Sequence, residues 1–144
     1  MFRKFFLVAA CVGMVSGPPA KAEELVPLQE FLLSIPTPIS DNSFLYVYSR
    51  CTSLFTMLTA LSPKDITRQL LETKAYQFMV AAADLQSKLS GLPLNEADSR
   101  VMKTVALMGH KYVDLANENY VTKGNIIGNP LIDSDFKLCV KIVK

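Results

Sequence analysis

Apolar residues recur along this chain at spacings of three and four, which is the period of an α-helix. The most regular stretch covers residues 43–61, in which Arg50 is the only basic residue and no acidic residue occurs. Its apolar face contains Phe44, Val47, Cys51, Phe55 and Leu58. A helix with so little charge is usually surrounded by other helices, so the pattern predicts a central core helix. The residues that can cap its start are Ser40, Asp41 and Asn42.

Two further helices are predicted after it, each with an apolar stripe and a glycine just past its end. The first begins with Ser62 as N-cap before Pro63 and ends before Gly91. Its stripe is Leu71, Ala75, Phe78, Ala82, Leu85 and Leu89. The second covers about residues 95–122 and ends before Gly124. Its stripe is Val101, Val105, Met108, Tyr112 and Ala116. Both stripes are typical of an antiparallel bundle.

Shorter helices are predicted near the two ends. Residues 23–34 have an apolar side of Leu28, Phe31 and Leu32. Asp133 or Ser134 is expected to cap a last helix, with the inner face Phe136, Cys139, Val140 and Val143. In the loop over residues 124–132, we expect three side chains to fold back over the bundle end: Ile126, Ile127 and Leu131. No strand pattern competes, so the predicted fold class is all-α, a small bundle of about four to five helices.

The first 22 residues have the pattern of a signal peptide. Arg3 and Lys4 precede an apolar run over residues 5–15, which is too short to span a membrane. Ala20-Lys21-Ala22 then offers a cleavage site before Glu23. We therefore expect a signal peptide at 1–22, a single helical domain at 23–144, and a periplasmic or secreted location. An alternative is a lipoprotein box ending at Cys11, although few apolar residues precede it.

Cleavage would change the charge balance. It removes three of the 15 basic residues and none of the 13 acidic residues, so the net charge falls from +2 to about −1. No basic patch then remains to indicate a nucleic-acid partner. Stable membrane insertion after cleavage is not expected, because Arg50 and the hydroxyl groups of the central helix would lie in hydrocarbon.

Two cysteines remain in the mature chain, Cys51 and Cys139, and each lies on the apolar face of its predicted helix. An exported chain with two inward-facing cysteines is expected to form one disulfide. Closing a loop of about 90 residues contributes roughly 4–5 kcal/mol in the chain-entropy model. The alternative is a pair of buried free thiols. A redox pair is less expected, because the chain has no Cys-x-x-Cys motif.

The sequence predicts no catalytic residues, no metal site and no cofactor. His110 is the only histidine and falls on the polar side of its helix, where Asp114 is a surface neighbour. That position disfavours haem ligation together with an interior methionine. Asp133 and Asp135 are interpreted as helix-start residues, where carboxylates suit the helix dipole. An enzyme would need loops to bring His110, Asp114 and Arg50 together.

Protein–protein binding by a non-catalytic exported protein, as an inhibitor, immunity protein or adaptor, is the leading hypothesis for function. It rests on a low-charge face of the central helix, which could meet an unidentified partner or a second copy of the chain. This face is Tyr46, Ser49, Arg50, Ser53 and Met57. The alternative is a carrier of a small apolar ligand. Its expected cavity is lined by Phe55, Phe78, Met108 and Tyr112.

Overall fold

The computed structural model describes residues 24–126 and 128–142, and these residues contain five α-helices and no strand. The helices are α1 (Leu28–Ser34), α2 (Asp41–Leu61), α3 (Asp65–Ser90), α4 (Leu94–Lys123) and α5 (Pro130–Ile142). The predicted all-α bundle is therefore confirmed. The expected signal peptide, including Cys11, lies outside the described residues.

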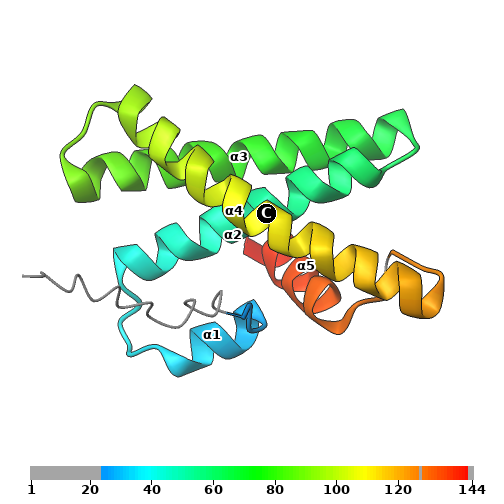
Figure 1. Ribbon diagram of the computed structural model, residues 1–144. Coiled ribbons are helices and arrows are strands. Elements are labelled where there is room, and N and C mark those ends of the chain that lie inside the picture. The colour runs from blue at the N-terminus through cyan, green and yellow to red at the C-terminus, as the bar shows by residue number, and fades with distance from the viewer. Residues whose placement is uncertain (1–23, 127, 143–144) are drawn as a thin grey trace, which may run out of the picture.

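Helix α2 is the centre of the fold. It packs against α3, α4 and α5, and α1 packs against α5. In Figure 1, α4 runs diagonally from the upper left across α3 and α2 to the lower right, and α1 and α5 lie in the lower half of the picture. Cys51, Leu54 and Phe55 of α2 are buried, which confirms the prediction of a central core helix. Among the described residues, no helix is long and apolar enough to span a membrane.

Polar residues and glycines set most helix ends as the sequence predicts. Ser40 caps α2, because its side chain accepts a hydrogen bond from the backbone N–H of Ser43. Gly91 and Gly124 end α3 and α4 in the left-handed conformation, each with φ of 68°. This conformation costs glycine little because it lacks a Cβ atom. The two glycines therefore allow the sharp changes of chain direction after α3 and α4.

The predicted start of α3 is wrong by two residues, because the helix begins at Asp65 and not at Pro63. Ser62 ends α2, since its N–H donates to the carbonyl of Thr59, and Lys64 occupies the N-cap position of α3. Arg68 holds this turn by donating a hydrogen bond to the carbonyl of Ser62. The residues after α2 thus form a short connection instead of the first turn of α3.

The start and the inner face of α5 also differ from the prediction. Asn129 caps this helix by accepting hydrogen bonds from the N–H groups of Leu131 and Ile132, and Pro130 is its first residue. The buried face is Ile132, Asp135 and Cys139. Of the predicted inner face, only Cys139 is buried. Phe136 and Val140 are 37% and 43% exposed, and Val143 lies outside the described residues.

The loop between α4 and α5 closes one end of the bundle. Ile126 and Leu131 are half-buried and pack against the core, as expected for side chains that fold back. Ile127, which was expected to join them, lies outside the described residues.

Candidate functional site

The predicted partner-binding face of α2 is mostly interior. Ser49, Arg50, Ser53 and Met57 are buried, and only Tyr46 is partly exposed. The small Ser53 side chain lets α4 approach closely, and its hydroxyl lies 2.9 Å from the carbonyl oxygen of Val105. The low charge of this face therefore reflects burial against α4. The four buried residues of this face therefore offer no exposed docking surface.

Arg50 is fully buried and uses its guanidinium group to join four parts of the fold. Nε donates to the Tyr112 hydroxyl of α4 at 3.1 Å, and Nη1 donates to the Tyr46 hydroxyl at 3.1 Å. Nη1 also donates to the backbone carbonyl of Val26 at 2.6 Å, before α1. Nη2 forms an ion pair with Asp135 of α5. A planar group with five N–H donors suits this position better than a lysine ammonium group would.

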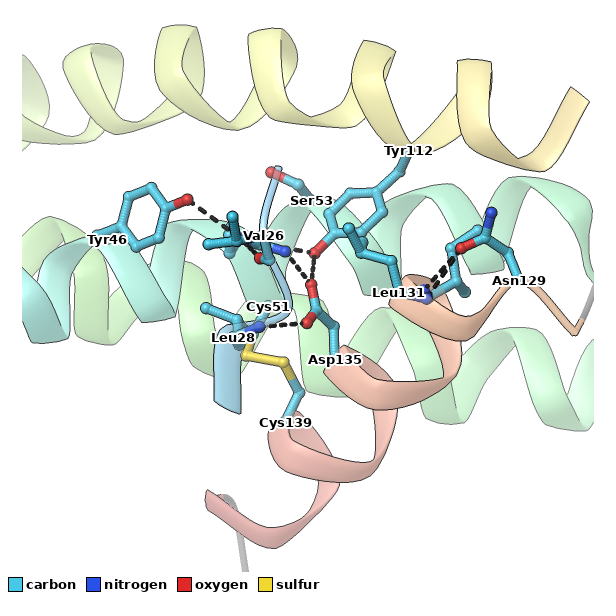
Figure 2. A network of polar contacts seen from close by, with 12 residues as sticks. Val26, Leu28, Tyr46, Cys51, Ser53, Tyr112, Asn129, Leu131, Asp135 and Cys139 are labelled. Atoms are coloured by element: carbon cyan, nitrogen blue, oxygen red, sulfur yellow. Dashed lines mark hydrogen bonds and ion pairs between the residues drawn. A yellow bond between two sulfur atoms is a disulfide. The ribbon is translucent and has the colours of Figure 1, made fainter. Parts of the chain in front are cut away.

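Asp135 completes the network from the opposite side. Its Oδ2 accepts hydrogen bonds from Arg50 and from the Tyr112 hydroxyl, the latter at 2.5 Å. Its Oδ1 accepts a hydrogen bond from the backbone N–H of Leu28 at 2.7 Å. Figure 2 shows Tyr112, Asp135 and Leu28 converging beside the disulfide between Cys51 and Cys139. The interpretation of Asp135 as a helix-start residue is wrong, because α5 begins five residues earlier.

The protonation states of the network follow from burial and neighbouring charge. Burial, followed by the charge of Asp135, raises the pKa of Tyr112 well above its usual value of 10.0, so the phenol keeps its proton and donates it. Burial by itself lowers the pKa of Arg50, but the interactions with Tyr112 and Asp135 outweigh it and raise that pKa overall. The guanidinium group therefore stays charged, as its ion pair requires.

This network, which we call the latch, joins α1, α2, α4 and α5 inside the fold. Arg50 and Asp135 have no exposed side-chain surface, and Tyr112 is equally buried. His110 and Asp114 are exposed on α4, so the structure does not bring them to the buried Arg50 as an enzyme mechanism would require. The predicted disulfide is confirmed, with the Cα atoms of Cys51 and Cys139 5.6 Å apart. Covalent and ionic contacts thus hold α5 to α2 at adjacent positions.

The four residues of the predicted ligand cavity do not line any one pocket together among the pockets of the described part of the chain. Phe55 and Phe78 stack on each other in the core, with ring centroids 5.9 Å apart, and Tyr112 belongs to the latch. Met108 lines a different surface pocket together with Tyr46 and the segment before α1. Three of the four predicted cavity residues are therefore engaged inside the fold: Phe55 and Phe78 in aromatic packing, and Tyr112 in hydrogen bonds.

An apolar pocket of about 570 Å³ instead lies where the α2–α3 turn faces the end of α4 and the loop before α5. These two connections are on the right in Figure 1. Its main apolar lining residues are Leu58, Leu61, Leu71, Tyr120, Ile126 and Phe136. Its polar lining residues are Ser62, Lys64 and Thr67, from the α2–α3 turn and the start of α3, and Asn125, from the loop before α5. A volume of this size is ordinary for small-molecule sites, which are mostly apolar with few polar groups.

Exposed apolar side chains mark this pocket in the structure. Leu61, Tyr120 and Phe136 line it and are 43%, 58% and 37% exposed. They come from three different helices, so no single helical stripe in the sequence identifies the pocket. The sequence does contain one signal for the burial of Asp135, which is the pair Asn129-Pro130 at the start of α5. This pair has the pattern of an N-cap followed by a proline at the first helical position. An α5 start read from this pair leaves Asp135 in the helix interior, one turn from Cys139.

The described part of the chain contains no group of three or more histidine, cysteine, aspartate or glutamate residues that could hold a metal ion. Comparison of this chain with protein-family models, with curated proteins and with solved structures finds no match.

Proposed function

We propose that this protein is a non-catalytic exported binding protein, and that the pocket beside the α2–α3 turn holds a small apolar ligand. The observation that carries the proposal is the pocket itself, about 570 Å³ in volume with a mostly apolar lining. Leu61, Tyr120 and Phe136 keep exposed surface there that a ligand would remove from water. Burying apolar surface contributes roughly 25 cal/mol per Å².

The rigidity of the pocket walls supports a binding role. Phe136 belongs to α5, which the disulfide and the Arg50–Asp135 ion pair attach to α2. Arg68 fixes the opposite wall through its hydrogen bond to Ser62. A pocket that exists before the ligand arrives avoids part of the ordering cost of binding.

Export is supported by the disulfide, since structural disulfides persist mainly in oxidising compartments. The signal-peptide pattern over residues 1–22 is the second support. A periplasmic or secreted location follows from the two together. The non-catalytic role is supported by the way in which Arg50, Tyr112 and Asp135 satisfy one another inside the fold.

Binding of a protein partner is the second candidate function. Ile66 and Leu70 are 85% and 59% exposed and lie one turn apart on α3, on the stripe next to the pocket residues Thr67 and Leu71. A partner helix could bury both stripes at once. Ile66 and Leu70 are open to a partner, whereas most of the low-charge face of α2 is buried.

Pocket filling tests the proposal. Thr67→Trp places an indole ring in the pocket from an exposed position, whereas Thr73→Trp places the same ring elsewhere on the exposed side of α3. We expect the full exported chain to bind a fluorescent apolar probe, the Thr73→Trp variant to bind it equally, and Thr67→Trp to lose at least ten-fold in affinity. Equal binding by both variants would place the probe elsewhere and refute the assignment of this pocket.

A further inference from the structure

We infer that the ligand of this pocket is an amphiphile with one anionic head group, with the head beside Lys64 and the apolar tail between α3 and α5. The inference rests on the proposed function, since it names the chemical class that the same pocket would take. A single-chain carboxylate is the simplest member of this class.

The charge of the pocket residues points to an anion. Among the described residues that line the pocket, Lys64 alone has a charged side chain. It is exposed and forms no ion pair with the described residues, whereas the neighbouring Asp65 pairs with Arg68 at 3.9 Å. The acidic side chain beside the pocket thus already faces a cation, and the Lys64 ammonium group is left to face an incoming anion.

The distribution of polar and apolar groups gives the ligand a direction. Ser62, Lys64 and Thr67 lie within six consecutive residues at the α2–α3 turn, so most of the polar lining is there, and Asn125 adds one amide from the loop before α5. Leu71 lies one turn further along α3 and is 9% exposed. Together with Ile126 and Phe136, it offers an apolar wall for a tail. A ligand with its head group at the turn and its tail toward Leu71 would place polar atoms beside the polar residues and apolar atoms beside the apolar wall.

The head group and the tail contribute differently to the binding affinity, because Lys64 is exposed and the tail would be buried. An exposed ion pair contributes about two- to five-fold in affinity, and salt weakens it. Each methylene group buried in an apolar site contributes up to about four-fold. The tail therefore supplies most of the affinity, and Lys64 supplies the preference for an anionic head.

Three ligands with the same eleven-carbon tail separate these contributions: dodecanoate, undecanol and undecyltrimethylammonium. Their affinities for the full exported chain are measured by displacement of a fluorescent probe, below the concentration at which each ligand forms micelles or separates from solution. We expect dodecanoate to bind about two- to five-fold more tightly than undecanol, and undecyltrimethylammonium to bind most weakly. High salt should reduce the difference between dodecanoate and undecanol.

Variants locate the head group. Lys64→Gln should remove the preference for dodecanoate, and Lys64→Arg should keep it. The matched control is Lys103→Gln, because Lys103 is exposed on α4 roughly 25 Å along the helix from the pocket residue Tyr120. This control should bind all three ligands as the unchanged protein does.

Each contrary result has a distinct meaning. Equal binding of the three ligands, or a preference that survives Lys64→Gln, overturns the anionic class or the head position while the apolar pocket stands. Binding of none of the three overturns this inference and the proposed function together.

Discussion

Arg50 and Asp135 form an ion pair in which neither side chain has exposed surface, although the two residues are 85 positions apart in the chain. The pair lies next to the bond between Cys51 and Cys139, and Arg50 is the direct neighbour of Cys51 in α2. A carbonyl before α1 and an N–H at the start of α1 bind to the same two side chains. One buried cluster therefore connects α1, α2, α4 and α5.

Removal of one partner of this ion pair should destabilise the fold strongly. Asp135→Asn or Arg50→Met leaves a buried charge without its counter-charge, and we expect a loss of about 3–5 kcal/mol in the free energy of unfolding. Urea denaturation followed by circular dichroism measures it. The double variant Arg50→Met/Asp135→Asn should lose less than the two single variants combined, because no charge is left buried. Additive losses would show that the two side chains do not act as a pair.

Loss of the disulfide should weaken the attachment of α5. The variant with both Cys51→Ser and Cys139→Ser is expected to lose up to about 4–5 kcal/mol, because its unfolded chain is no longer cross-linked. Hydrogen exchange should rise first in α5, which is only 13 residues long and depends on packing for its stability. Reductant should destabilise the unchanged protein and leave the double-serine variant unaffected. Unchanged exchange in α5 would contradict a fastening role.

Tyr112 should make the protein sensitive to alkali. Its folded pKa is raised above the usual value of 10.0, so above pH 10 the unfolded phenol loses its proton while the folded phenol keeps it. The stabilisation is present below pH 10 and is lost as the pH rises, by about 1.4 kcal/mol per pH unit. Tyr112→Phe should remove this slope, which denaturation at several pH values measures. Tyr76→Phe, at a residue that is 71% exposed, should retain it.

A charge at Ser53 should unfold the protein rather than block a partner. Ser53 is 1% exposed and faces the carbonyl of Val105, so the carboxylate of Ser53→Glu would be buried beside an acceptor. We expect a largely unfolded chain by circular dichroism. Thr56→Glu introduces the same side chain at an exposed position on α2 and should fold normally. A folded Ser53→Glu variant would show that α4 does not cover this face as described.

The two features that organise the fold differ in how far the sequence reveals them. Cys51 and Cys139 are both inward on their own helical faces, so the sequence of an exported chain favours a bridge between them and leaves a pair of free thiols as the alternative. Asp135 lies one turn before Cys139 and so shares its inward face. The sequence nevertheless favours a role at the helix start for this residue, because the helix is expected to begin close to it. Only the position of Arg50 across the interior explains why this carboxylate can be buried.

The apolar pocket beside the α2–α3 turn shows the same limit to what the sequence reveals. Helical periodicity assigns Phe55, Phe78 and Tyr112 inward positions, and all three are buried. It does not say whether inward side chains fill the space between helices or line a cavity, because that depends on how neighbouring helices pack. The stacking of Phe55 on Phe78 leaves no cavity between those two rings, and the pocket arises where two connections meet at the bundle end.

The sequence by itself determined the all-α class and most of the helix ends, because helical period, caps and glycine conformations are local properties of the chain. It favoured the disulfide, and the tertiary structure shows the two cysteines bridged. The tertiary structure decided that Arg50 is buried, that Asp135 faces it, and that the apolar pocket lies beside Lys64. These outcomes depend on residues far apart in the chain, and the free energy of burying a charge or leaving a pocket open is set only when those residues meet.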